Sequence, residues 1–287
     1  MKKLISLIVA VILVAGIMSI VMSADGYLAD KEIPYGTAKI DGKFDEWSKA
    51  AKFTVDGSNV KIVGNASWTE GNAITVSLMH DDTYLYFAYE VTNTDKGLLY
   101  FGAGGEGIAM FFDIAGVAAA NGDKNMHNGS VKVVPVVASA GSTDVTGALL
   151  GYPTSKYNAN DWVNISNTEN VLEDVAAIGS GETYSIEARV KLADMRSMIA
   201  DDYGVEVPEV KAGTEITFMI SYDNYGKNQL QANWSLTAKD GPYAVPSQYG
   251  FRGVLAEKSA STADMTAIVV LVSAVAAGAV ALMCKKH

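Results

Sequence analysis

The sequence predicts an all-β protein, an antiparallel β-sandwich of the jelly-roll or immunoglobulin-like type, with an apolar segment at each end of the chain. Three observations support this prediction. Many short stretches alternate apolar and polar residues, the period of two that is typical of half-buried strands. Turn-forming residues separate these stretches at regular spacing, and almost none of the chain has the period of a helix. The two terminal segments, 4–22 and 265–283, are instead almost continuously apolar.

The first terminal segment predicts a signal peptide over residues 1–24. Two lysines lie near its start, residues 4–22 are nearly all apolar, and Ser23 and Ala24 are small residues suited to a cleavage site. An uncleaved membrane anchor is the alternative, because the apolar run is long for a signal peptide. Cleavage leaves a β-sandwich domain over residues 25–256.

The strongest strand pattern lies in residues 74–91. Apolar side chains alternate over residues 74–78 and again over residues 85–91, with β-branched and aromatic residues among them. The polar break between them, residues 81–83, is short, so we expect an antiparallel hairpin. One face of this hairpin needs a cover, and a second sheet is the expected one.

The other elements are expected on both sides of this hairpin. Before it, Asp45 can cap a short helix that contains Trp47, and residues 53–63 give one or two short strands. After it, residues 93–107 and 141–170 are rich in glycine and polar residues and predict loops, and residues 194–201 predict a helical turn. Further strands are expected at residues 108–114, 131–138, 184–192, 216–222, 230–236 and 250–255.

The second terminal segment predicts a transmembrane helix over residues 265–283, after a linker at residues 257–264. The segment is long enough to cross a hydrocarbon core and carries no charge. Two lysines follow it, so the positive-inside rule predicts a cytoplasmic tail over residues 284–287. The predicted localisation is therefore the cell membrane, with a single span and the domain on the extracellular side.

Charge and composition exclude several functions. The net charge of −10 disfavours nucleic acid as a partner, because phosphates are bound by lysine and arginine. The single cysteine, Cys284, lies beyond the predicted helix, so the domain has no disulfide. The domain contains His80 and His127 but no pattern typical of a nucleophilic, phosphate-binding or paired-histidine zinc site. We therefore expect a protein that is not an enzyme.

Two pairs of residues on the predicted hairpin are candidate ligands for cofactors. Asp81 and Asp82 could contribute oxygens to a calcium site, although aspartate is also a favoured turn residue. Met79 and His80 could be axial ligands of a b-type haem. Methionine is equally an ordinary residue for filling gaps in a core.

Several motifs, in a fixed order, resemble family 9 carbohydrate-binding modules. Residues 35–47, Tyr-Gly-Thr-Ala-Lys-Ile-Asp-Gly-Lys-Phe-Asp-Glu-Trp, are similar to the opening signature of that family, and Asp-Asp-Thr-Tyr-Leu-Tyr at residues 81–86 is similar to its central hairpin. The resemblance continues through residues 106–113, 184–191, 213–224, 234–235 and 246–255. It covers roughly residues 33–256. The modules that the chain resembles belong to the DOMON-like superfamily, which also includes haem-binding domains of the ethylbenzene dehydrogenase type.

The resemblance implies a β-sandwich that binds carbohydrate, often the ends of sugar chains, between two tryptophans. Tyr243 stands at one of the tryptophan positions, and Tyr100 and Phe101 are the aromatic residues closest to the other. Lys132 falls near an arginine of the family's middle strand, whereas Val134 stands where the family has an asparagine. Aromatic rings that lie flat on a sugar, with polar groups on its hydroxyls, are a suitable arrangement for such a ligand.

Three functions remain open from the sequence. The first is a cell-surface-anchored, non-catalytic carbohydrate-binding module that uses Tyr243, Tyr100, Phe101 and Lys132. The second is an electron-transfer domain that binds b-type haem through Met79 and His80. The third is a structural surface protein without a small ligand.

Overall fold

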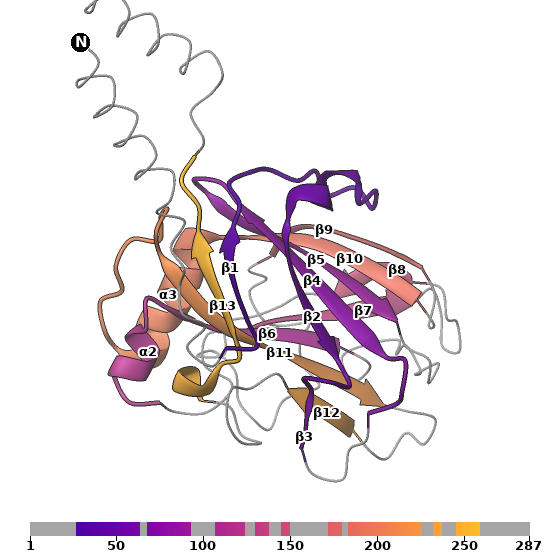
Figure 1. Cartoon of the computed structure of the whole chain (residues 1–287). Coiled ribbons are helices and arrows are strands. Elements are labelled where there is room, and N and C mark those ends of the chain that lie inside the picture. The colour runs from indigo at the N-terminus through magenta and orange to yellow at the C-terminus, as the bar shows by residue number, and fades with distance from the viewer. Residues whose placement is uncertain are drawn as a thin grey trace, which may run out of the picture.

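Two packed β-sheets form the computed structural model of this chain (Figure 1). The structure describes residues 27–63, 68–92, 107–123, 130–137, 145–149, 172–179, 183–225, 232–236 and 245–258. The predicted signal peptide, membrane helix and cytoplasmic tail fall outside these residues. Within the described part of the chain, no helix is both long enough and apolar enough to cross a membrane.

Strands make up most of the described chain, as predicted. In chain order they are β1 (Ala29–Ile33), β2 (Ala51–Asp56), β3 (Lys61–Val63), β4 (Ala73–His80), β5 (Tyr84–Thr92), β6 (Gly107–Ile114), β7 (Ser130–Val137), β8 (Val145–Leu149), β9 (Leu172–Gly179), β10 (Thr183–Lys191), β11 (Glu215–Tyr225), β12 (Ala232–Leu236) and β13 (Phe251–Leu255). The helical elements are η1 (Asp45–Lys49), α2 (Val117–Ala120), α3 (Leu192–Tyr203) and η4 (Pro246–Gln248).

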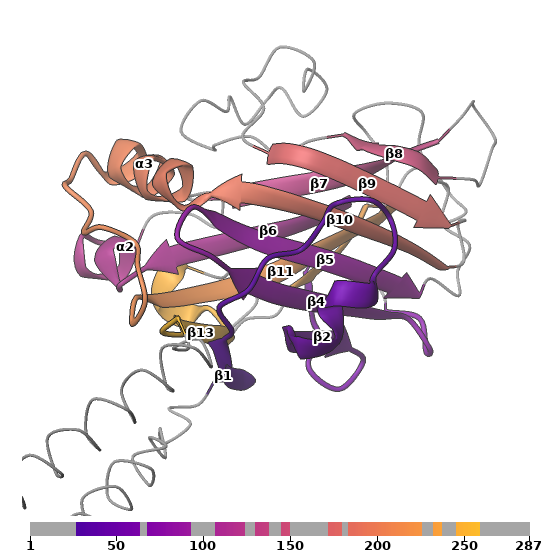
Figure 2. The same cartoon turned by 90° about the horizontal axis from the view of Figure 1, so that it is seen from above.

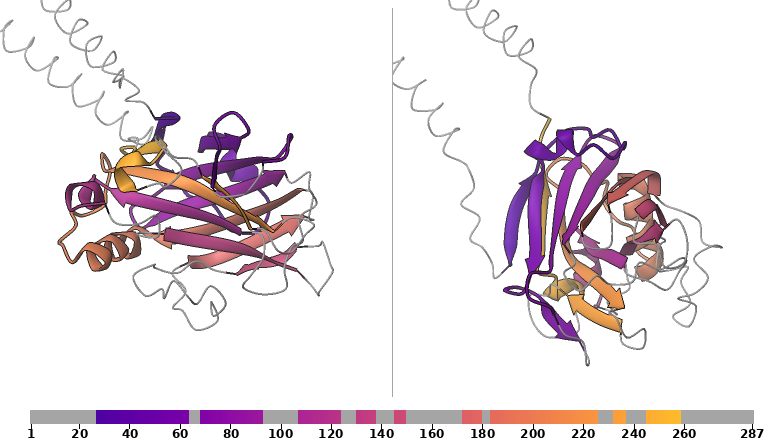
Figure 3. Two further views of the ribbon diagram at one scale, coloured as in Figure 1. Left: turned by 90° about the horizontal axis from the view of Figure 1, so that it is seen from below. Right: turned by 90° about the vertical axis from the view of Figure 1, so that its right-hand side faces the viewer.

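The strands form two sheets, whose layers are visible in Figure 3. Sheet A has the order β1-β13-β11-β6-β7-β8, and β12 joins it between β11 and β3. Sheet B has the order β2-β4-β5-β10-β9. The pair β1–β13 is parallel, and the other pairs between the described strands are antiparallel. The predicted hairpin is confirmed, because β4 pairs with β5 from Ala73–Thr92 to His80–Leu85 across the turn at residues 81–83.

The core lies between the sheets and is built from the alternating residues of each strand. The inward residues of β4, namely Ile74, Val76 and Leu78, are almost completely buried. Aromatic rings from both sheets meet there: Phe53 of β2 packs edge-on against Phe218 of β11, with 4.9 Å between the ring centroids. Burial of this apolar surface is the main stabilising contribution to such a fold.

A second apolar cluster lies on the outer face of sheet B. It contains Trp47, Met79, Tyr86, Ala38 and Ala88, all of them buried. The segment before β2 crosses this face (Figure 2), and its residue Trp47 belongs to the buried cluster. The short helix predicted at Asp45 is present as η1, and Trp47 is its buried residue.

Some elements differ from the prediction. The helical turn expected at residues 194–201 is part of α3, which has 12 residues and buries Met195, Met198 and Ile199 against the core. Strand β1 lies in a short polar stretch for which no strand was predicted. It forms because its parallel pairing with β13 is reinforced by Asp30, whose carboxylate accepts a hydrogen bond from Arg252 at 2.9 Å. Strand β9 lies in a stretch for which no strand was predicted, and β10 provides its pairing partner.

Candidate functional site

The turn between β4 and β5 is organised by the carboxylate of Asp81. One of its oxygens accepts hydrogen bonds from the backbone N–H groups of Thr83 and Tyr84, both at 2.7 Å. The other accepts the hydroxyl of Tyr86, also at 2.7 Å. Burial alone would raise the pKa of Asp81, but these hydrogen bonds outweigh it and hold the pKa below its usual value. Both oxygens of Asp81 are therefore occupied within the turn.

Asp82, the next residue, connects the turn to the end of the domain. Its carboxylate accepts the hydroxyl of Tyr35 at 2.9 Å and lies 3.9 Å from the ammonium group of Lys258. Lys258 also lies over the ring of Tyr35, 5.2 Å from its centroid. No set of three His, Cys, Asp or Glu side chains in the described part of the chain is arranged to hold a metal ion. The predicted calcium role of Asp81 and Asp82 thus finds no third ligand of these residue types among the described residues.

Met79 and His80 point to opposite faces of sheet B, as neighbours on one strand must. Met79 is buried in the outer cluster that also contains Trp47. His80 is buried too: its Nδ1 lies 3.2 Å from the carbonyl oxygen of Asp81, and its Nε2 lies 3.1 Å from that of Ala256. One haem iron cannot reach both side chains in this arrangement. The haem alternative would require both of them to leave their present contacts.

Two clefts flank this turn and share the residues Asp82, Leu192, Glu209 and Val210. Their volumes are about 220 and 250 Å³. Charged side chains of both signs line them, and Tyr35 and His80 are the lining residues that carry a ring. The clefts therefore offer mixed charge rather than a flat apolar surface.

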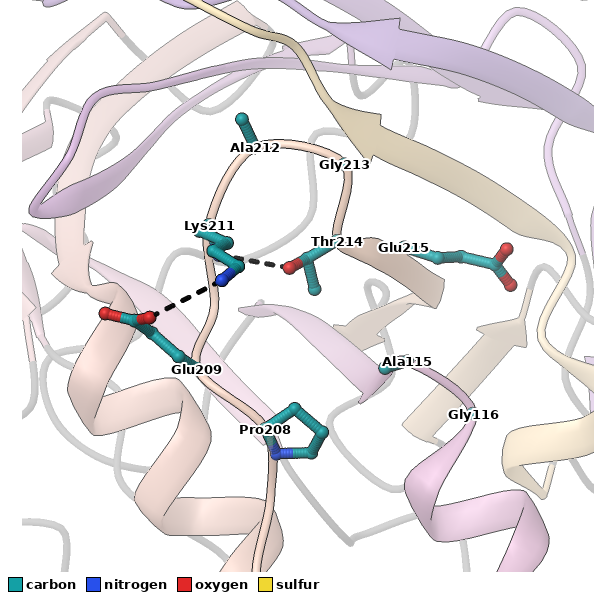
Figure 4. A pocket seen from close by; sticks show the side chains of 9 residues that line it. All are labelled: Ala115, Gly116, Pro208, Glu209, Lys211, Ala212, Gly213, Thr214 and Glu215. Carbon is teal, nitrogen blue, oxygen red and sulfur yellow. Dashed lines mark hydrogen bonds and ion pairs between the residues drawn. The ribbon is translucent and has the colours of Figure 1, made fainter.

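A larger open groove, of about 550 Å³, lies beside the loop that precedes β11 (Figure 4). Its lining residues are Ala115, Gly116, Pro208, Glu209, Lys211, Ala212, Gly213, Thr214 and Glu215. Its charged groups are partly paired, since Lys211 lies 3.8 Å from Glu209. None of these described lining residues carries an aromatic ring, so they offer no surface on which a sugar would stack.

The predicted sugar-binding residues are placed only in part. Tyr100, Phe101 and Tyr243 lie outside the described residues. Lys132 lies on β7, where its backbone pairs with Ala109 of β6, two residues from Gly107. Gly107 is also the first described residue after the segment that carries Tyr100 and Phe101. The backbone thus brings Lys132 near the attachment point of these two aromatic residues.

Tyr243 is attached elsewhere on the domain. The nearby Ser247, in η4, donates its backbone N–H to the carboxylate of Asp123 at 3.3 Å. Asp123 follows α2, which in turn follows the last residue of β6. The eight residues of β6 span about 23 Å, at roughly 3.3 Å per residue. The two predicted aromatic positions are therefore attached near opposite ends of β6.

The sequence did not reveal a buried carboxylate on the outer face of sheet B. Glu187 of β10 is fully buried, because residues of the segment before β2 cover it. One of its oxygens accepts the backbone N–H of Asp41 at 3.2 Å, and the other has no hydrogen-bond partner. Burial raises the pKa of Glu187. Hydrogen bonds from the backbone of Asp41 and Gly42 offset part of this rise, and the negative charges of Asp41 and Glu46 add to it. A signal was present in the sequence, since Met79 and Tyr86 are large side chains that alternate away from the apolar face of the hairpin.

Comparison with known proteins gives structural similarity only. No family model and no curated protein matches this chain. A family 9 carbohydrate-binding module from Caldicellulosiruptor kristjanssonii in complex with cellotriose is 14% identical and has a TM-score of 0.48, covering 81% of this chain and 97% of that one. A structure of such a module from the same organism with glucose is 15% identical, with a TM-score of 0.48 and coverage of 81% and 100%. At these values the similarity concerns the backbone and assigns no ligand to this chain.

Proposed function

We propose that this chain is a membrane-tethered, non-catalytic carbohydrate-binding module on the cell surface. The observation that carries the proposal is the set of motifs described above, which occur in family order along a chain that folds as a two-sheet sandwich. Aromatic residues at or near the sugar-stacking positions, Tyr243, Tyr100 and Phe101, supply the recognition surface. Lys132 supplies a polar group for the sugar hydroxyls.

The topology supports a tethered arrangement. Strand β13 ends at Leu255, and the chain leaves the domain beside the hairpin turn, where Lys258 contacts Asp82 and Tyr35. The predicted membrane helix begins only a few residues later, so this end of the sandwich faces the membrane. Strand β6 starts at the opposite end. Its last residue, Ile114, pairs with Ile216 near the start of β11, where Glu215 pairs with Val254 near the end of β13. Tyr100, Phe101 and Lys132 are therefore attached at the end that points away from the membrane.

Binding to polysaccharide gels tests the proposal. The full-length chain in detergent is run on native gels cast with soluble polysaccharides, and we expect at least one polysaccharide to retard it. Tyr243→Ala should abolish the retardation and leave the unfolding temperature nearly unchanged, because the predicted role of this ring is contact with the ligand. Phe101→Ala tests the second ring in the same way.

Two results would count against the proposal. Absence of retardation by any polysaccharide would favour a structural surface protein. A Soret band in the absorbance spectrum of the purified chain would favour the haem-binding alternative. If Tyr243→Ala instead unfolds the domain, Tyr243 is a core residue and the assignment of the site to it is wrong.

A further inference from the structure

The segment of residues 36–50 covers part of the outer face of sheet B and encloses an unusual group of polar atoms. The oxygen Oε1 of Glu187, Oε2 of Glu46, the indole N–H of Trp47 and the hydroxyl of Ser77 are all buried without a hydrogen-bond partner. Ser77 and Glu187 both pair with Ala88 of β5, so they lie in one row across the sheet. Buried polar atoms in proteins are nearly always hydrogen-bonded, so this group needs an explanation.

The charges around Glu187 are unfavourable for its ionised form. Asp41 and Glu46 lie on the covering segment and add two further carboxylates. Other groups that can ionise on the neighbouring elements are Lys39, Lys43, Asp45 and Lys49 of the segment, Tyr84, Tyr86 and Glu90 of β5, Glu173 and Asp174 of β9, and Arg189 and Lys191 of β10. Lys39, Lys43, Arg189 and Lys191 form ion pairs with other carboxylates. Lys39 binds Asp41 at 2.6 Å, and Arg189 binds Asp174 at 2.7 Å and stacks on Tyr84.

No cation in the described part of the chain forms an ion pair with Glu187. Asp41 keeps its own charge, because its hydrogen bond with Lys39 lowers its pKa. A fully buried carboxylate without a counter-charge is costly, whereas the protonated acid can be accommodated. Protonation also changes Oε1 from an unpaired acceptor into a donor.

We propose that residues 36–50 form a proton-sensitive strap, which is closed on sheet B while Glu187 is protonated and loosened when Glu187 loses its proton. The proton exchanges with solvent, and no other reactant is required. The strap is suited to local opening, because it covers the carboxylate of Glu187, which accepts a hydrogen bond from a backbone N–H of the strap. This device is independent of the proposed sugar site.

The direction of the pH effect follows from linkage. An acid whose pKa is higher in the closed state binds its proton more tightly there, so closing is favoured at low pH. The strap is fully stabilised below the ordinary glutamate value of 4.5. Its stability then falls as the pH rises from 4.5 to the raised pKa of Glu187 in the closed state. The equilibrium constant for closing falls by about tenfold for each pH unit in that interval.

Hydrogen exchange of the strap amides, between pH 4 and pH 8, tests this proposal. The full-length chain in detergent is compared with Glu187→Gln, and the rates are corrected for the intrinsic pH dependence of exchange. In the wild-type protein, protection of residues 36–50 should fall as the pH rises. In Glu187→Gln it should be independent of pH. Glu90→Gln is the matched control, since Glu90 lies on the same face but is exposed, and it should behave like the wild type.

Other outcomes would overturn the proposal. Corrected protection that does not change with pH in the wild type, or that falls equally in Glu187→Gln, excludes a role for this proton. Protection at pH 8 that is restored by calcium in the wild type, but not in Glu187→Gln, would show that a cation rather than a proton neutralises the site. If Glu187→Gln does not fold, Glu46→Gln serves instead, and the loss of protection should then be smaller because one repelling charge is gone.

Discussion

Replacement of Asp81 by alanine gives the sharpest test of what holds the hairpin turn together. The change removes three hydrogen bonds to one carboxylate, from Thr83, Tyr84 and Tyr86. The two backbone N–H groups can turn to water. The hydroxyl of the buried Tyr86 still accepts a hydrogen bond from Arg189 but loses the acceptor for its own proton, at a cost of about 1–3 kcal/mol. When the smaller cost of the two lost backbone hydrogen bonds is included, we expect Asp81→Ala to lower the free energy of unfolding by about 3 kcal/mol.

Thermal unfolding of the full-length chain in detergent measures this effect. For a domain of this size, about 3 kcal/mol corresponds to a fall of roughly 6–12 °C in Tm. Asp82→Ala is the matched control, because its carboxylate is exposed, and its removal should change stability by no more than about 0.5 kcal/mol. An equal loss of stability in both variants would contradict this role of Asp81. An increase in Tm with calcium in the wild type, but not in Asp82→Ala, would also contradict it, since the two carboxylates would then act together on a cation.

Two further predictions concern sheet A. A Cβ atom on Gly253 would lie 2.4 Å from Cδ1 of the fully buried Ile33, so Gly253→Ala should cost about 1–3 kcal/mol in unfolding experiments. Ile33→Val removes that carbon, and the double variant should be more stable than the sum of the two single losses predicts; strict additivity would show that the contact is absent. Asp113 accepts the backbone N–H groups of Ala118 and Ala119 at the start of α2, so Asp113→Ala should cost about 0.5–2 kcal/mol, and an unchanged Tm would contradict this capping role.

Much of the architecture follows from local pattern. The strands β4 and β5 were predictable because their apolar residues alternate, and a three-residue polar break leaves the chain no route other than a tight turn. The helix α3 was underestimated because its buried residues Met195, Met198 and Ile199 occupy one face of a segment whose other residues are polar. Its end was readable from Gly204, which has a positive φ of 66° and closes the helix.

The outer layer of sheet B could not be predicted in this way. Alternation placed Glu187 on the face away from the core, which is correct, and such a residue is ordinarily exposed to solvent. Its cover comes from Asp41, 146 positions earlier in the chain, and no local pattern reports a contact of that separation. For the sugar site, the sequence names aromatic residue types, but it does not state that Lys132 lies near Gly107 while Tyr243 is attached near the other end of β6.

The strap is fixed at both ends, which determines the kind of motion it can make. At its start, the backbone N–H of Gly36 donates to the carbonyl oxygen of His80 at 2.7 Å, and the hydroxyl of the preceding Tyr35 donates to Asp82 of the turn. At its end, the chain enters β2, where Ala51 pairs with Leu78. Loss of the proton on Glu187 can therefore loosen the middle of the strap without releasing it. Because Trp47 lies between these fixed ends and is buried in the same cluster as Met79, the expected result is faster exchange of a few amides within a domain that remains folded.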